Sequence, residues 1–143
     1  MRLEVEDVIM TRHELRYKAM TILYQAFLYE SNNIEYNIDN IILEQLNESN
    51  KFVSSLVNGV ISNREEIDNL ANKYLSDWDI SRLGFTDQAI LRIGIYEIMW
   101  TDTPDVSCID EAVELSKEYS DEKVCKMING VLDKVYHSKG KNE

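Results

Sequence analysis

Apolar residues recur every three or four positions along most of this chain, and that spacing is the strongest constraint on its fold. The pattern returns in about seven stretches between residues 12 and 135. An apolar stripe of this period covers one face of an α-helix, whereas a half-buried strand alternates every second residue. The chain has one proline and five glycines, few turn residues for an all-β protein of 143 residues. The sequence therefore predicts an all-α fold with about seven helices.

Polar breaks and capping residues set the expected helix limits. Thr11 and Glu14 have the spacing of a capping box, so the first helix should begin at residue 12. Asn63 is the expected N-cap of the fourth helix, and Ser107 and Ser120 those of the last two. The expected helices are 12–30, 38–46, 51–61, 64–76, 86–100, 108–119 and 121–135. The connections are short, so we expect a single domain over 1–143, with 1–10 and 137–143 disordered.

The predicted fifth helix is apolar over most of its circumference, which is typical of a central helix. Arg92 lies in this run, and we expect it to pair with a carboxylate of a neighbouring helix because burying an unpaired guanidinium is costly. Asn58-Gly59 and Asn129-Gly130 would suggest hairpin turns elsewhere. Each pair stands within an apolar stripe of helical period, so we expect glycine to permit close helix approach at both places.

The charge of the chain argues against unaided nucleic-acid binding. The formal net charge is −11, whereas phosphate contacts need clustered cations. No stretch approaches the ~20 apolar residues that span a bilayer. Residues 1–10 carry Glu4, Glu6 and Asp7 where a signal peptide has basic residues. We therefore expect a cytoplasmic protein.

The sequence contains none of the residue groupings that catalysis or metal binding requires. His13 and His137 stand at opposite ends of the chain, and Cys108 and Cys125 lack metal-ligand spacing. We expect both cysteines to be buried as small apolar side chains. Acidic residues follow helical spacing in the sixth predicted helix, which fits a solvated face: Asp110, Glu111, Glu114 and Glu118. We expect no enzymatic activity, no cofactor and no metal site.

Several strings in the second half of the chain resemble the NusB family. In order, they are Arg82-Leu83, Asp87, Ile90-Leu91-Arg92-Ile93, Tyr96-Glu97, Pro104, residues 111–117 and residues 129–134. Residues 19–24 resemble a string in the first helix of the family. The resemblance implies two small helical bundles packed together. It also implies a transcription antitermination factor that binds boxA RNA together with the ribosomal protein NusE, acts on the transcription elongation complex and supports ribosomal RNA transcription.

The first helix of the family usually opens with an arginine-rich run that contacts RNA, and this chain keeps part of it. Arg12 and Arg16 match, whereas His13 replaces an arginine. The resemblance therefore assigns RNA binding to Arg12, His13 and Arg16. The two arginines are four residues apart, so they should share a helix edge from which both reach phosphates. Residues 1–20 carry four cations and four anions, and we expect weak RNA binding that a basic partner strengthens.

For the surface that faces NusE, the resemblance points to Tyr24, Asp87 and Met127. Met127 stands where the family usually has an aromatic residue, so apolar contact is retained. Core packing is the alternative for Tyr24 and Met127, and stabilisation of a helix N-terminus is the alternative for Asp87. The sequence leaves open a homodimer that covers the same surface.

Two other functions remain as alternatives. The chain could be an interaction module that kept the fold and lost RNA binding, and the distribution of charge decides between these two. It could also be a NusB-like domain detached from a ribosomal RNA methyltransferase, although 143 residues leave no room for the catalytic domain.

Overall fold

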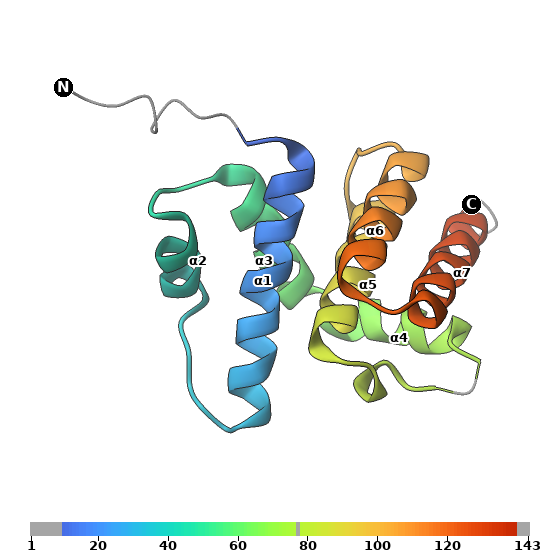
Figure 1. Cartoon of the computed structure of the whole chain (residues 1–143), viewed down its shortest axis with the longest axis horizontal. Coiled ribbons are helices and arrows are strands. Elements are labelled where there is room, and N and C mark those ends of the chain that lie inside the picture. The colour runs from blue at the N-terminus through green and yellow to red at the C-terminus, as the bar shows by residue number, and fades with distance from the viewer. Residues whose placement is uncertain (1–9, 77, 140–143) are drawn as a thin grey trace.

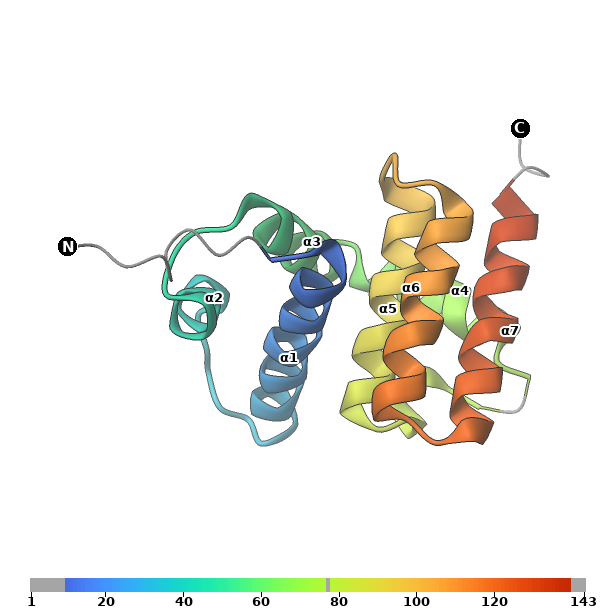
Figure 2. The same cartoon turned by 45° about the horizontal axis from the view of Figure 1, so that its top comes forward.

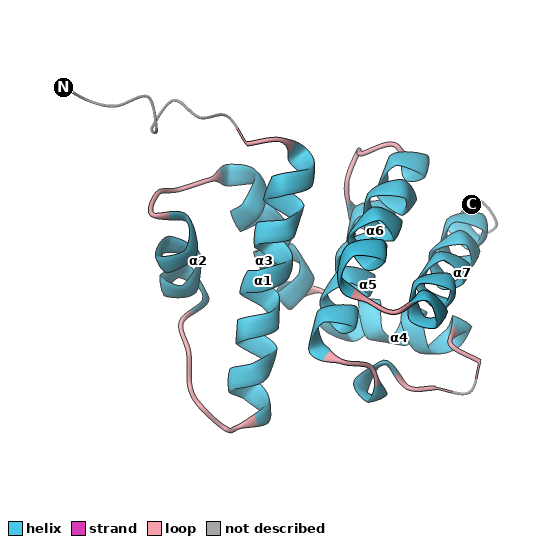
Figure 3. Cartoon of the chain, in the orientation of Figure 1, coloured by secondary structure: helices cyan, strands magenta, loops and turns pink. Residues whose placement is uncertain are grey.

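Seven α-helices and one short 3₁₀ helix make up the described part of the chain, residues 10–76 and 78–139 of a computed structural model. Figure 3 shows no strand among these residues. The helices are α1 (Arg12–Ser31), α2 (Ile38–Leu46), α3 (Lys51–Ser62), α4 (Arg64–Tyr74), η2 (Ile80–Arg82), α5 (Phe85–Trp100), α6 (Asp105–Tyr119) and α7 (Glu122–Lys139). The all-α prediction is confirmed.

The helices form two lobes that meet along α1 and α5. Figures 1 and 2 show α1, α2 and α3 on one side and α4 to α7 on the other. Helix α5 contacts α1, α3, α4, α6 and α7, which confirms the expected central helix. Ala89, Ile90, Leu91 and Ile95 are fully buried on it. A helix enclosed on so many sides must be apolar around its circumference, and α5 is.

Local capping explains where several helices begin. Thr11 and Glu14 form the predicted capping box, because each side chain accepts a hydrogen bond from the backbone N–H of the other. Asn37 and Asn50 cap α2 and α3 by a single bond each, in which the side-chain oxygen accepts from the backbone N–H of Asn40 or Val53. Helices α1, α2 and α3 therefore begin at residues 12, 38 and 51, where the sequence predicts them.

Two predicted caps are wrong, and a third is correct in position only. Asn63 stands at the N-cap of α4 as expected, but its amide donates back to the carbonyl of Gly59 and its side chain makes no capping bond to α4. Helix α6 begins at Asp105 after Pro104, whose fixed φ suits a helix start, so Ser107 lies inside the helix. Ser120 ends α6, and the carboxylate of Asp121 accepts from Val124 N–H at the start of α7.

The two Asn-Gly pairs lie within helices as expected, but only one glycine permits a close approach. A Cβ on Gly59 of α3 would lie 2.2 Å from Cζ of Tyr96 on α5, so the two helices need a bare backbone there. A Cβ on Gly130 of α7 would meet nothing within 4 Å. Gly130 faces solvent, and the prediction for it is wrong.

Arg92 confirms the expected pairing of a cation within the apolar run. Its guanidinium donates to both carboxylate oxygens of Asp68 on α4, at 2.8 and 3.0 Å, and to the side-chain oxygen of Gln88 at 3.0 Å. Its carbon centre lies 4.5 Å from the ring centroid of Phe27. The buried charge is therefore paired with a carboxylate, as the physical argument requires.

Helix α7 extends further towards the C-terminus than the sequence predicts. His137, Ser138 and Lys139 belong to α7, where disorder was expected. The expectations for residues 1–9 and 140–143 lie outside the described residues. Within residues 10–76 and 78–139, no helix is long and apolar enough to cross a membrane.

Candidate nucleic-acid and partner interface

Arg12 begins α1 with an exposed guanidinium. Its carbon centre lies 4.0 Å from the ring centroid of Phe52 on α3, in a cation–π contact. Among the described residues Arg12 forms no ion pair, unlike Arg16, Arg64 and Arg92. A guanidinium stacked in this way keeps its N–H groups at its edge, where they can bind phosphate oxygens.

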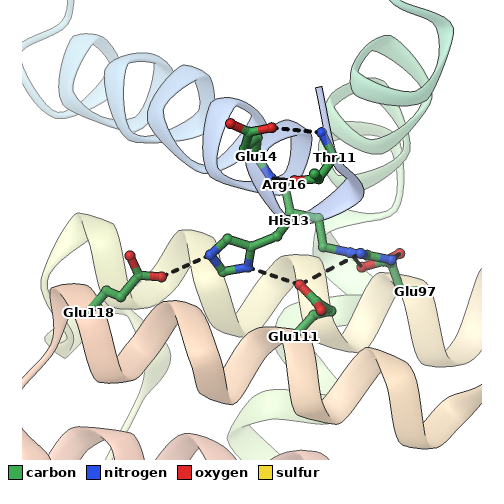
Figure 4. Close-up of polar contacts among 7 residues, drawn as sticks. All are labelled: Thr11, His13, Glu14, Arg16, Glu97, Glu111 and Glu118. Carbon is green, nitrogen blue, oxygen red and sulfur yellow. Dashed lines mark hydrogen bonds and ion pairs between the residues drawn. The ribbon is translucent and has the colours of Figure 1, made fainter. Parts of the chain in front are cut away.

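Arg16 lies in a very different setting, although it is only four residues further on. Its side chain donates to both carboxylate oxygens of Glu97 on α5, each at 2.8 Å (Figure 4). Arg16 is 5% exposed and Glu97 is 2% exposed. Burial disfavours the charged form, but the hydrogen bonds and charge of Glu97 outweigh it and raise the pKa of Arg16.

The expectation of an exposed edge shared by Arg12 and Arg16 is therefore wrong. Successive helical residues are rotated by about 100°, so residues four apart differ by about 40°. In α1 that rotation carries Arg16 into the face that packs on α5 and leaves Arg12 at the surface.

His13 bridges two carboxylates of α6. Its Nδ1 lies 3.0 Å from Glu111 Oε1, and its Nε2 lies 2.9 Å from Glu118 Oε1 (Figure 4). Ionised carboxylates only accept hydrogen bonds, so both contacts are hydrogen bonds when the ring is protonated on both nitrogens, and the arrangement favours the imidazolium. The pKa of His13 is raised, mainly by the hydrogen bond to Glu111, with Glu118 adding to the effect against partial burial.

These contacts fasten the start of α1 to the other lobe. Glu111 Oε1 also lies 3.9 Å from a terminal nitrogen of Arg16, so Glu111 faces both cations. One turn later, the rings of Tyr17 and Tyr119 stack with centroids 5.2 Å apart. The solvated face expected for α6 is thus only partly correct, because Glu111 and Glu118 contact His13 of α1, although Glu118 is exposed like Asp110 and Glu114.

The three residues expected to face NusE lie on or next to the first turn of α5. Tyr24 is 41% exposed, and its ring meets that of Phe85 edge to face with centroids 6.3 Å apart. Asp87 accepts a hydrogen bond from the hydroxyl of Ser120. Asp87 and Met127 both line a hollow of about 370 Å³, together with Trp78 and Arg82. Tyr24 is therefore not a core residue, and it contacts Phe85 in the first turn of α5, two residues before Asp87.

The comparison with known proteins decides what kind of chain this is. The model of the NusB family matches residues 13–137. The chain belongs to the NusB family. The transcription antitermination protein NusB of Campylobacter jejuni strain RM1221 is 40% identical over 131 residues, which cover 90% of this chain and 98% of that protein.

Solved structures of NusB proteins have the same fold. NusB of T. maritima superposes with a TM-score of 0.77 at 29% identity, covering 91% of this chain and 93% of that one. A second neighbour is a crystal structure of the antitermination factors NusB and NusE in complex with double-stranded RNA. It gives a TM-score of 0.72 at 28% identity, covering 90% of this chain and 99% of that one. These matches confirm the predicted NusB-like architecture.

Sequence reasoning missed the carboxylates that hold the NusB-type first helix in this chain. Glu97 stands among Ile93, Ile95 and Ile98 in the apolar fifth helix, and the argument applied to Arg92 applies equally to it. Glu111 and Glu118 gave no comparable signal, because residues seven apart on a polar helix face look solvated. Sequence reasoning also assigned no role to Trp78, which is 47% exposed and lines the hollow with Asp87 and Met127. No group of three or more metal-ligating side chains occurs within the described ranges.

Proposed function

We propose that this NusB-family chain acts in transcription antitermination by binding boxA RNA together with NusE, in support of ribosomal RNA transcription. Family membership across residues 13–137 carries the proposal. The antitermination role of the Campylobacter relative and the solved complex of NusB with NusE and RNA support the same partners here. The proposed role is non-enzymatic and cytoplasmic.

For RNA, the geometry favours unequal roles for the three predicted residues. Arg12 is the proposed phosphate ligand, because it is exposed and unpaired within the described residues. His13 lies beside it, but Glu111 and Glu118 neutralise its charge. Arg16 acts as a positioning residue, since its hydrogen bonds to Glu97 hold the first turns of α1 against α5. Among these three described side chains only Arg12 is free of an ion pair, which implies weak binding alone, and a basic partner adds its own phosphate contacts.

For NusE, we propose the surface formed by Tyr24, Asp87 and Met127. The exposed ring of Tyr24 and the hollow lined by Asp87 and Met127 are features of the kind that interface hot spots use, an aromatic anchor and a pocket. Asp87 contributes a carboxylate at the edge of the hollow, where a basic side chain of the partner can pair with it.

A second candidate function follows from one observation. Two of the three cations assigned to RNA already contact carboxylates of this chain. The chain would then be a protein-interaction module that binds NusE and no longer contacts RNA. The match to the Campylobacter protein covers 98% of that protein, so it is a match to a whole antitermination protein, and the methyltransferase alternative is not favoured.

Fluorescence anisotropy of a labelled boxA RNA would test the proposal. The RNA is titrated with this chain, with NusE and with both, at low and near-physiological salt. We expect weak binding by the chain alone and tighter, salt-sensitive binding by the pair. Arg12→Ala should weaken binding and reduce the log–log salt slope by about 1, as for loss of one phosphate contact.

Lys126→Ala is the matched control, because Lys126 is exposed on α7 and lies outside both proposed surfaces. It removes the same charge and should change RNA binding much less than Arg12→Ala. Binding of NusE without any gain in RNA affinity would favour the interaction module. Equal effects of the two substitutions would contradict the role proposed for Arg12.

A further inference from the structure

Asp87, in the first turn of α5, is held by a residue from a distant part of the chain. The hydroxyl of Ser120 donates a hydrogen bond to Asp87 Oδ1. Ser120 ends α6, and Figures 1 and 2 both show the α6–α7 turn beside the start of α5. The two residues are 33 positions apart, so no spacing within α5 predicts the contact. The α6–α7 turn therefore orients a carboxylate that belongs to α5.

This hydrogen bond engages one oxygen of the carboxylate and leaves the other beside Gly84. A Cβ on Gly84 would lie 3.5 Å from Asp87 Oδ2. Gly84 is exposed, and both residues line the hollow of about 370 Å³. Within the described residues, Oδ2 accepts no hydrogen bond and forms no ion pair. Oδ2 is thus an unoccupied acceptor, and the bare backbone of Gly84 leaves space next to it.

Three other charged side chains line the same hollow. The carboxylate of Asp121 accepts a backbone hydrogen bond at the start of α7, so this chain already uses it. Arg82 and Lys123 are exposed, and neither forms an ion pair with a described residue. Exposed arginine and lysine side chains can turn their charge into solvent. The half-buried carboxylate of Asp87 is therefore the positioned acceptor of the hollow, and its charge is not neutralised by a neighbour.

The hollow also has an apolar wall that suits the stem of a basic side chain. Trp78 and Met127 line it together with Asp87, and Trp78 is 47% exposed. Lysine and arginine lay their aliphatic stems along apolar surface while the charged head reaches a polar group. An apolar wall beside a fixed carboxylate oxygen therefore fits one lysine or arginine side chain.

We propose that Ser120 is a positioning residue of the NusE interface, whose hydroxyl holds Asp87 so that Oδ2 receives one basic side chain of NusE. The inference rests on the proposed NusE surface and adds Ser120 and Gly84 to it. Ser120 acts through Asp87. Gly84 contributes by having no side chain, which keeps the approach to Oδ2 open.

Isothermal titration calorimetry of NusE with this chain tests the role of Ser120. Ser120→Ala keeps the backbone N–H bond that ends α6 and should weaken NusE binding by about tenfold, as for loss of a hydrogen bond to a charged group. Ser120→Thr should restore most of the affinity, because the extended backbone at this position suits a β-branched residue. Ser107→Ala, on the exposed surface of α6, is the matched control and should change the affinity little.

A double-mutant cycle separates positioning from an independent effect of Ser120. Asp87→Ala should itself weaken NusE binding, and adding Ser120→Ala should then have no further effect. Gly84→Ala places a methyl group 3.5 Å from Oδ2, an ordinary contact that the fold accommodates, and should also weaken NusE binding. Urea unfolding of each variant, without NusE, shows that the losses of affinity do not come from loss of the fold.

Carbon-13 nuclear magnetic resonance observes the hydrogen bond without NusE. The carboxyl resonance of Asp87 is assigned by its absence from Asp87→Ala. It should shift in Ser120→Ala and return towards its original position in Ser120→Thr. It should shift again when NusE is added to the unmodified chain. A resonance that Ser120→Ala leaves in place would contradict the contact on which the inference stands.

The outcomes separate this inference from the proposed function. Tight NusE binding by Ser120→Ala, or additive losses in the cycle, would overturn the positioning role and leave the NusE surface intact. NusE affinity that Gly84→Ala does not change would contradict an approach to Oδ2 beside Gly84. If Asp87→Ala leaves NusE affinity unchanged, or if NusE does not bind the unmodified chain, the proposed surface fails and the inference fails with it.

Discussion

Arg16 of α1 and Glu97 of α5 form a bidentate ion pair at the interface between the two lobes, with both N–O distances at 2.8 Å. The two side chains are 5% and 2% exposed, so water contributes little to solvating either charge. A buried pair of this kind adds little net stability compared with apolar residues, but removal of one partner leaves the other charge buried and unpaired.

We therefore expect Glu97→Ala to lower the free energy of unfolding by about 3–5 kcal/mol, measured by urea denaturation. Replacing both partners with apolar residues, as in Arg16→Met with Glu97→Leu, should restore much of that loss. Glu114→Ala is the matched control, because Glu114 pairs with Lys117 at 3.6 Å on the exposed face of α6. Its effect should be several times smaller. Equal losses from the two glutamates would show that Arg16 remains solvated.

The His13 bridge should make stability depend on pH. Its folded-state pKa is raised, chiefly by Glu111, so its contribution is complete below the unfolded value of 6.5 and is lost as pH rises through the folded value. The ring is 38% exposed and solvent screens it, so we expect a contribution of about 0.5–1 kcal/mol. The difference in unfolding free energy between the unmodified chain and His13→Gln should be larger at about pH 6 than at about pH 9.

Nuclear magnetic resonance titration of the His13 ring would check the cause directly. Glu118→Gln and Glu111→Gln should each lower the pKa of His13, because each removes a carboxylate that stabilises the imidazolium. A measured pKa at or below 6.5 in the unmodified chain would contradict the bridge.

The two helical glycines should respond in opposite directions to alanine. At Gly59 the new methyl group would lie 2.2 Å from the Tyr96 ring, which Trp100 supports from the other side. We expect Gly59→Ala to destabilise the protein by about 1–3 kcal/mol, as overpacking does. Gly130→Ala meets nothing within 4 Å and should stabilise α7 by about 0.5–1 kcal/mol. Thermal or urea unfolding measures both, and effects of the same sign would contradict the helix packing described.

Both cysteines should resist alkylation in the folded protein. Burial raises the pKa of Cys108 to about 12, and this residue is 1% exposed. Cys125 is 9% exposed, and its sulfur accepts a hydrogen bond from Ser116 Oγ. Because the thiolate is the reactive form, iodoacetamide should label neither residue at neutral pH until urea unfolds the chain. Rapid labelling without denaturant, detected by mass spectrometry, would show that a local opening exposes the thiols.

The sequence by itself determined the features that arise from neighbours along the chain. Helical period marked all seven α-helices of the described chain, and the limits of α2 agree with expectation at both ends because Asn37 caps its start and Asn47, in the left-handed conformation, ends it. The sequence also predicted that a carboxylate would pair with Arg92, because a buried guanidinium needs an anionic partner, but it did not identify Asp68. The short sequence strings shared with the NusB family identified the architecture, because each string is continuous in sequence.

Only the tertiary structure decided which side chains of α1 remain free for another molecule. Arg16 meets Glu97, which is 81 residues away, and His13 meets Glu111 and Glu118, which are 98 and 105 residues away. A rotation of about 40° between residues four apart separates an exposed Arg12 from a buried Arg16. Which of those directions is buried depends on how α1 packs against α5 and α6. That packing is set by the whole apolar core, and no spacing within α1 encodes it.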